Sequence, residues 1–516
     1  MLNKLLLTIF ILIFNQNLFS QTYTFKKKFN SDDRIEFLGL TKEIFEINKN
    51  ISYNVGNYDT AQFEQIKPVQ YNDDYLKKIQ TELAKDSLNA ITLSNFANYY
   101  SNTGNGSLAK IYFTKSLKNW SLKAKTKKDS AFYYSFKGIL EMNLEKENAI
   151  EDIEKALEIN PKDSIALNFY PIFLIQKKEF SKAKKVCSTA LEDPKNENPE
   201  IAYLFFSLGV IFENMEKVFD ESKKIENRKK SYTELFDYKS IENASALHQK
   251  NQRILYLKKM MDILGLTVKM LTFETTPDNN VIRDYDKFEI KKINQLKLDF
   301  QELLIKKKIN PYSANKSLAM LYFFTNENEK AIEHAKKAIT IFPDSKRTSY
   351  FNSDEVYELL QTLYLTKKDD INFEKTLKEK IEKTSKHQKS INDYTNMAYL
   401  YLYKNDFEEA ENWCNKAREI DPDNFKALSL LAHLKLMKNG LESGIGQFYL
   451  GQSSKQIKDE SDNFNLSIQA ATYMILYGNN ANAKSAYDNI EACKKLVPKK
   501  TGFCDELINS YIQINP

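Results

Sequence analysis

The sequence predicts an all-α fold in which helical hairpins stack side by side. A first observation is a phrase that recurs in three places, as NAIEDIEKALEINP (148–161), KAIEHAKKAITIFP (330–343) and EAENWCNKAREIDP (409–422). A second is the length of 516 residues, which exceeds what one ordinary compact core supports. A third is the composition, with 13 glycines, 11 prolines and 28% charged residues, which is typical of a helical protein with few tight turns.

The recurring phrase has the spacing of one helix of a hairpin. Ala149 and Ala156 are seven residues apart, nearly two helical turns, so their methyl groups lie on one face and a neighbouring helix can come close. Pro161 cannot continue the helix and starts a turn. Upstream, Tyr133 and Phe136 begin a second apolar stripe at helical spacing. The two stripes predict one helical hairpin.

The hairpin recurs with a period of 34 residues. Adding 34 to Ala149 and Ala156 gives Ala183 and Ala190, again two alanines. A helix-turn-helix unit with this period is typical of tetratricopeptide repeats, and the chain resembles that family. The clearest unit, 391–424, carries the family pattern at Tyr394, Met397, Ala398, Tyr401, Ala410, Cys414, Ala417 and Pro422.

About nine units of uneven quality follow this pattern. They span 90–123, 130–163, 164–197, 202–216, 312–345, 354–387, 391–424, 425–458 and 464–497. The resemblance implies an α-solenoid, a right-handed superhelix of hairpins, with a helical insertion that lacks the period in the middle. The expected organisation is a signal peptide (1–20), an N-terminal segment with a capping helix (21–88), a first array (90–216), a helical bridging region (217–310), a second array (312–497) and a C-terminal capping helix (498–516).

The first twenty residues predict export. Lys4 precedes an apolar run at 5–14 and a polar stretch that ends before Gln21, which is the pattern of a secretory signal. The run is about half the roughly 20 residues that a bilayer requires. The most apolar later stretch, 254–271, contains four charged residues and predicts an amphipathic core helix, so no transmembrane anchor is expected. The expected location is periplasmic, outer-envelope associated or secreted.

The charge pattern argues against nucleic-acid binding, and the absence of catalytic motifs argues against an enzyme. The formal net charge is +6, and short basic clusters such as 306–308 stand among acidic residues, as on solvated helix faces. The four histidines, His248, His334, His387 and His433, have no second ligand at metal-binding spacing, and the motifs of phosphate loops, zinc proteases and serine hydrolases are missing. We therefore expect no enzyme, no cofactor and no metal site. Asp423 is expected to cap the next helix.

The four cysteines divide into two pairs. Cys187 and Cys414 occupy the same position on their helices and are expected to be buried and separate. Cys493 and Cys504 flank a turn at Pro498, and a disulfide between them in an oxidising compartment is left open, because it requires Cα atoms within about 7 Å.

The resemblance implies a non-enzymatic scaffold that binds a protein or peptide in a concave groove lined by the first helices. In the second array those positions hold Lys316, Met320, Phe323, Thr395, Tyr399, Leu402, Ser429, His433 and Leu436. Two alternatives are a small catalytic or ligand-binding insert within 217–310 and the sensor arm of a regulatory system. The identity of the partner and the oligomeric state stay open.

Overall fold

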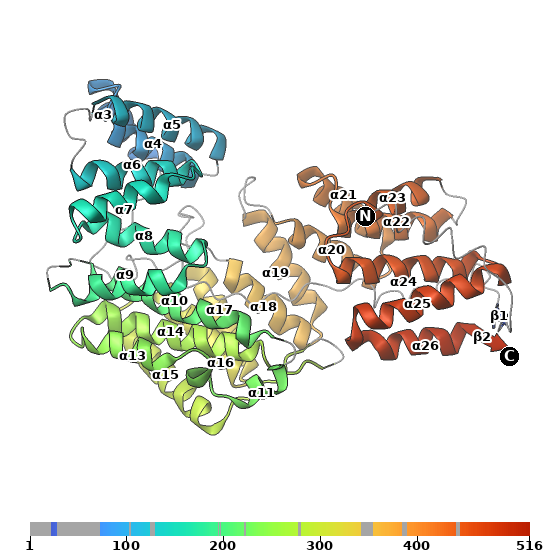
Figure 1. Cartoon of the computed structure of the whole chain (residues 1–516). Helices are drawn as coiled ribbons and strands as arrows, with labels where there is room; N and C mark the ends of the chain where they lie inside the picture. Colours follow the sequence, from blue (N-terminus) through green and yellow to red (C-terminus); the bar gives the residue numbers. More distant parts are fainter. Residues whose placement is uncertain are drawn as a thin grey trace. The chain divides into compact units, whose positions relative to one another are not determined.

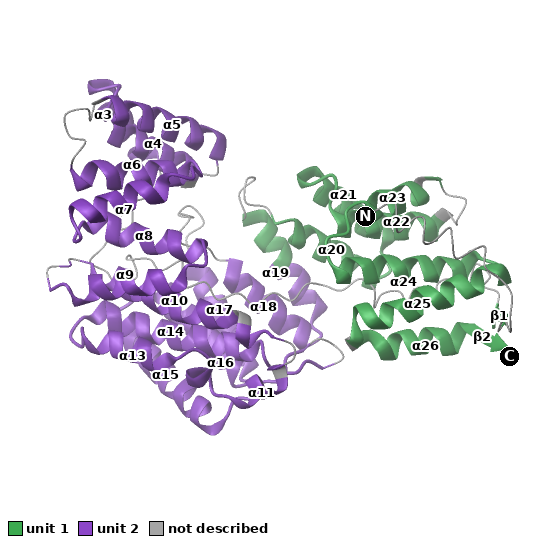
Figure 2. Cartoon of the chain, viewed as in Figure 1, with its two compact units in different colours: residues 1–49, 377–384, 389–516 green, residues 50–376, 385–388 purple. Residues whose placement is uncertain are grey.

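The protein is helical throughout the part that the structure describes, apart from two short strands. The computed structural model describes residues 22–27, 73–102, 105–123, 130–194, 196, 198–220, 223–276, 280–341, 354–383, 390–439 and 444–515. The chain forms two compact units, unit 1 (residues 1–49, 377–384 and 389–516) and unit 2 (residues 50–376 and 385–388) (Figures 1 and 2). The predicted all-α fold is confirmed.

Unit 2 begins with an N-terminal series of hairpins. Its helices are α3 (Asp73–Lys85), α4 (Ala90–Asn102), α5 (Gly106–Lys123), α6 (Ala131–Asn143), α7 (Ala149–Ile159), α8 (Ser164–Gln176), α9 (Phe180–Glu192) and α10 (Pro199–Val218). The helices pair as α4 with α5, α6 with α7 and α8 with α9, and each pair contacts the next along the chain (Figure 1). This serial packing of hairpins is the expected α-solenoid.

The middle of the chain is helical but lacks the hairpin period. It contains α11 (Lys224–Lys229), α12 (Tyr232–Leu235), α13 (Tyr238–Ala246), α14 (Gln252–Met270) and α15 (Lys287–Ile305). The predicted amphipathic helix at 254–271 is wrong in one respect. From Met260 to Met270 every residue of α14 is buried, because α10, α12 and α13 all pack against this helix.

Unit 2 then returns to hairpins, and unit 1 continues them. The helices are α16 (Pro311–Phe324), α17 (Asn328–Ile341), α18 (Asp354–Thr366), α19 (Asp370–Lys383), α20 (Ile391–Tyr403), α21 (Phe407–Ile420), α22 (Phe425–Asn439), α23 (Gly444–Ser454), α24 (Glu460–Tyr477), α25 (Ala483–Leu496) and α26 (Thr501–Tyr511), with short 3-10 turns at Asn480–Asn482 and Pro498–Lys500. Pairs such as α16 with α17 and α20 with α21 repeat the hairpin of the N-terminal series.

Hairpins from both units share one turn geometry. The second residue after the first helix has a positive φ in five of them, at Glu145, Lys178, Asn326, Lys368 and Asn405. The same two backbone hydrogen bonds accompany it each time; in the first turn, Glu145 N donates to Met142 O and Lys146 N donates to Glu141 O. This is the Schellman arrangement, which satisfies the carbonyl groups at the end of a helix. Lys307, between α15 and α16, has this geometry as well.

Small residues sit where the two helices of a hairpin, or two hairpins, meet. The paired alanines of the three phrases, and the pair 34 residues after the first, are at most 1% exposed: Ala149, Ala156, Ala183, Ala190, Ala331, Ala338, Ala410 and Ala417. Gly138 on α6 is equally close to its neighbour, because an added Cβ would lie 2.5 Å from Ile153 Cγ1 and 3.0 Å from Ala149 O. The side chain of the preceding residue, Lys137, points instead to Asp152, with Nζ 2.6 Å from Oδ2.

Two short strands join distant ends of the sequence, and the sequence analysis did not predict them. β1 (Thr22–Phe25) pairs antiparallel with β2 (Ile512–Asn515), with Thr22 opposite Asn515. Phe25 N donates to Asn480 Oδ1 at 3.2 Å, which attaches β1 to the 3-10 turn before α25. The predicted C-terminal capping helix at 498–516 is therefore wrong for its last residues, since α26 ends at Tyr511. The β-branched residues of β2 favour the extended strand.

The sequence predicts no transmembrane helix. Over the residues that the structure describes, none of the helices combines the length and the apolar character that crossing a bilayer requires.

Candidate partner-binding site

The nine residues expected to line an open groove are covered by neighbouring helices. Eight of them are at most 4% exposed: Met320, Phe323, Thr395, Tyr399, Leu402, Ser429, His433 and Leu436. The ninth, Lys316, has a side chain that is 15% exposed and forms an ion pair with Glu355, Nζ to Oε2 at 2.6 Å. A partner cannot reach most of these side chains without moving a helix. Peptide binding by these residues stays a prediction, and the burial of their side chains argues against it.

In unit 1, Ser429 and His433 belong to a buried polar network between α22 and α24. Ser429 Oγ donates to Gln469 Oε1 at 2.9 Å, and Gln469 Nε2 donates to the hydroxyl of Tyr473 at 2.8 Å. That hydroxyl lies 3.4 Å from His433 Nδ1. Burial lowers the pKa of His433 to about 3, so the imidazole is neutral at physiological pH. The network holds two helices together and leaves no accessible histidine.

In unit 2, a predicted groove residue on α16 is also covered by another part of the chain. The guanidinium of Arg283 lies over the ring of Phe323, 3.7 Å from its centroid. Burial lowers the pKa of Arg283 to about 10. Arg283 Nη1 also donates to Asn326 Oδ1 at 2.5 Å, so the segment before α15 covers the end of α16. The covering segment lies outside the repeats, which is why the repeat pattern could not reveal it.

The remaining histidines and the acidic turn have structural contacts. His248 Nε2 lies 2.9 Å from Leu191 O, and His334 Nδ1 lies 2.8 Å from Asn315 Oδ1, while His387 falls outside the described residues. The described residues include no group of three or more His, Cys, Asp or Glu side chains placed to hold a metal ion. The expected cap at Asp423 is wrong by one residue, because Asn424 Oδ1 accepts from Ala427 N at 3.1 Å.

All four cysteines are buried and free. The disulfide left open between Cys493 and Cys504 is not formed in the structure. Cys493 Sγ instead donates to Phe464 O at 3.8 Å. Burial raises the pKa of both thiols, to about 12 for Cys493 and about 11 for Cys504, so both are protonated at neutral pH.

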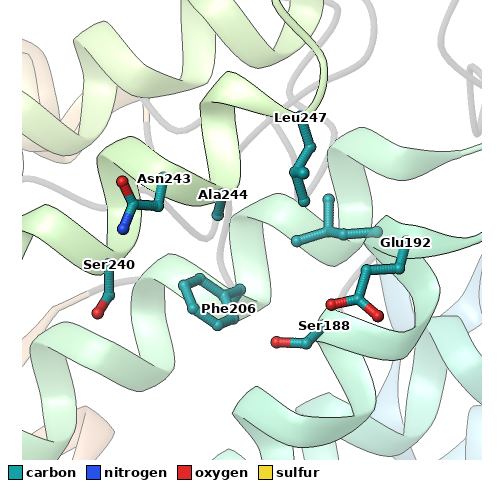
Figure 3. Close-up of a pocket in the computed structure, with 8 residues that line it drawn as sticks. Ser188, Glu192, Phe206, Ser240, Asn243, Ala244 and Leu247 are labelled. Atoms are coloured by element: carbon teal, nitrogen blue, oxygen red, sulfur yellow. The ribbon is translucent and has the colours of Figure 1, made fainter.

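An accessible recess does occur, where α9 and α10 of a repeat meet α13 of the bridging region. Figure 3 shows its side chains. The cavity has a volume of about 270 Å³ and is lined by Ser188, Leu191, Glu192, Phe206, Ser240, Asn243, Ala244 and Leu247. We call it the α9–α13 recess. The sequence analysis missed it, because only tertiary packing brings 240–247 against the repeat and no motif marks those residues.

The α9–α13 recess combines apolar walls with unused polar groups. Leu191, Phe206, Ala244 and Leu247 supply the apolar surface, and the side chain of Leu247 is 59% exposed. Ser188, Glu192 and Asn243 make no side-chain hydrogen bond or ion pair with any residue that the structure describes. Ser240 Oγ, by contrast, donates to Asp237 Oδ2 at 2.8 Å. An apolar recess with polar groups at its edge suits a side chain or small ligand that has an apolar body and a polar end.

The fold and this recess define a class: an all-α repeat protein of stacked helical hairpins, with a recess where the repeats end. Models of the tetratricopeptide repeat match residues 145–163, 315–345 and 392–424. The first stretch covers α7 and the turn before it, and the other two cover hairpins α16–α17 and α20–α21. The chain therefore contains tetratricopeptide repeats at these three stretches.

Solved structures similar to this chain include several helical-repeat proteins. A tetratricopeptide repeat protein from Parabacteroides merdae is 13% identical, with a TM-score of 0.33 over 58% of this chain and 96% of the other. Yeast Tom70 is 16% identical, with a TM-score of 0.26 over 81% and 88%. The C-terminal part of a repeat protein from Cytophaga hutchinsonii is 12% identical, with a TM-score of 0.32 over 66% and 98%. No curated protein matches the sequence.

The depressed pKa of His433 predicts a specific pH dependence of stability. Below pH 6.5 the unfolded chain binds a proton at this residue and the folded chain does not, so the stability is present above pH 6.5 and is lost as the pH falls toward 3. The loss is at most about 1.4 kcal/mol per pH unit. His433→Gln should therefore close the stability gap to the wild type by about 1 kcal/mol between pH 7.5 and 5.5, measured by urea unfolding. As a control, Ser429→Ala should show a constant gap; a constant gap for His433→Gln would contradict the account.

Proposed function

We propose that this protein is an exported, non-enzymatic scaffold that binds another protein. Helical hairpins stacked in series expose a large surface for their length, and tetratricopeptide repeats are protein-binding modules as a family. The polar clusters around His433 and Lys316 hold helices together, and neither presents a nucleophile and a base to solvent. These features support a binding role.

The observation that carries the proposal is the α9–α13 recess. Its lining combines three polar groups without partners among the described residues with four apolar side chains, all in unit 2. Glu192 is exposed, and its carboxylate would accept a hydrogen bond from the cationic end of a partner's side chain. Phe206 and Leu247 would contact the hydrocarbon stem of that side chain. A lysine or arginine side chain of a partner has this combination of stem and cation. We infer that the recess receives such a side chain.

The same recess supports a second candidate function, a ligand-binding insert in 217–310. Four of its lining residues, at 240, 243, 244 and 247, come from that region. Its volume of about 270 Å³ is near the lower limit of small-molecule sites. Binding of a free small molecule to the purified chain, without a protein partner, would favour this second function.

Site-specific photocrosslinking tests the protein-binding proposal. With a photoreactive amino acid in place of Asn243 at the edge of the recess, the full chain should give one discrete adduct with a protein from the native host. Lys239 is exposed on the same helix but does not line the recess, so the same group there should give none. Equal adducts from both positions, or none from Asn243, would contradict the proposal.

Charge reversal tests the inferred lysine or arginine. Glu192→Lys places a second cation at the edge of the recess and should abolish the adduct from Asn243, because like charges repel at short distance. Glu158→Lys is the matched control, since Glu158 is exposed at the end of α7 and no described residue pairs with it. An adduct that survives Glu192→Lys would show that the recess does not receive a cation.

Export is the second part of the proposal and rests on the sequence of residues 1–20, which lie outside the described residues. The mature protein is expected in the periplasm, at the outer envelope or in the medium. Expression of the full chain in its host, followed by N-terminal sequencing of the protein from the envelope and secreted fractions, should give a chain that begins at Gln21. A chain that retains residues 1–20 in the cytoplasm would contradict export.

A further inference from the structure

A second cavity lies between α5 and the α6–α7 hairpin in the N-terminal part of unit 2. It has a volume of about 420 Å³ and is lined by Lys110, Thr114, Leu117, Lys118, Ser121, Glu141, Leu144 and Lys146. We call it the lysine cavity. Its chemistry differs from that of the α9–α13 recess, because cationic groups and hydroxyls dominate its lining.

One face of α5 supplies most of these polar groups. Lys110, Thr114, Lys118 and Ser121 are spaced by four, four and three residues, so they share that face. Lys146 approaches from the turn between α6 and α7. The structure describes no ion pair between a carboxylate and any of the three lysines, Lys110, Lys118 and Lys146, although the protein makes many such pairs elsewhere. The cavity therefore holds an excess of positive charge.

Glu141 is the buried member of the lining, only 3% exposed. Its Oε1 accepts from Asn148 Nδ2 at 3.3 Å and lies 3.5 Å from Lys137 Nζ. Its Oε2 is buried and has no hydrogen-bond partner among the described residues. A buried polar atom without a partner costs free energy and points to a missing water, ion or ligand. Burial and the neighbouring Asp152 raise the pKa of Glu141 to about 7.

We propose that the lysine cavity binds an oxyanion that keeps a proton of its own, with inorganic hydrogen phosphate as the ligand. The three ammonium groups would balance the charge of the anion, and the hydroxyl of Ser121 would donate to one of its oxygens, whereas the hydroxyl of Thr114 donates to Lys110 O at 2.8 Å. The P–OH group would donate to Glu141 Oε2 and satisfy the buried acceptor. This site is separate from the α9–α13 recess and independent of the protein-binding function.

At pH 8 the ionised carboxylate of Glu141 distinguishes between anions that carry a proton and anions that do not. At pH 8 hydrogen phosphate still carries one O–H, whereas sulfate and a phosphomonoester dianion carry none. An ionised Glu141 would meet either of those anions oxygen to oxygen, and the contact would be repulsive. An excess of lysines without Glu141 would bind all three anions according to charge alone. The proposal therefore predicts selectivity as well as binding.

Isothermal titration calorimetry of the full mature chain at pH 8 tests this selectivity. Inorganic phosphate should bind at least about tenfold more tightly than sulfate or glycerol phosphate, a ratio that corresponds to one hydrogen bond to a charged group. Equal affinity for the three anions would show non-selective attraction to lysines. The absence of phosphate binding at millimolar concentration would overturn the proposal outright.

Variants separate the carboxyl from the charge. In Glu141→Gln the side-chain amide can donate to any oxyanion, so the preference for phosphate over sulfate should fall to about twofold or less. Lys118→Gln should weaken phosphate and sulfate together by about fivefold, because it removes charge alone. Lys115→Gln is the matched control on the same helix, since Lys115 lies over the ring of Tyr112 outside the cavity, and it should change neither affinity.

A wild-type measurement keeps the test valid if Glu141→Gln fails to fold. The groups that face Glu141 are Lys137 on α6, Asp152 on α7 and the three lysines of the cavity. As Glu141 takes up a proton between pH 8 and 6, its carboxyl can donate to sulfate, so sulfate should bind at least about fivefold more tightly at pH 6. A sulfate affinity that is constant over this range would contradict the role of Glu141.

Discussion

The structure depends on close contact between helices at positions that hold alanine or glycine. The alanines of the repeated phrase are completely covered, and at Gly138 the facing helix leaves no room even for one methyl group. Such contacts place each hairpin against the next at a short distance, and interiors packed at that density tolerate little extra volume. The left-handed turn residue and its two backbone hydrogen bonds recur because each hairpin must reverse direction within a few residues.

Close packing also decides where function can reside. The nine predicted groove positions of the second array are covered or nearly covered by neighbouring parts of the chain, so these side chains do not form an open binding surface. Accessible cavities occur where the series is irregular instead. The α9–α13 recess forms beside a helix that has no repeat partner, and the lysine cavity forms beside α5, which is longer than the second helix of the next hairpin.

The sequence alone predicted the helical hairpins, because spacing of small residues and prolines is a local property. It predicted the burial of Cys187 and Cys414 for the same reason. It did not predict which surfaces stay open. Phe323 is covered by Arg283 and Ser429 by Gln469, and both partners lie about 40 residues away with no motif to connect them. The strand β2 was missed because its partner β1 lies at the other end of the chain.

Amide hydrogen exchange of Gly138→Ala tests the central role of close helix contact most directly. Intrinsic helix propensity alone would stabilise α6 by about 1 kcal/mol in this variant. The contact with Ile153 and Ala149 predicts the opposite, a loss of protection in α6 and α7 equivalent to about 1 to 3 kcal/mol. Gly502→Ala, where an added Cβ meets nothing within 4 Å, should show no such loss in α26. Increased protection in α6 and α7 of Gly138→Ala would contradict the account.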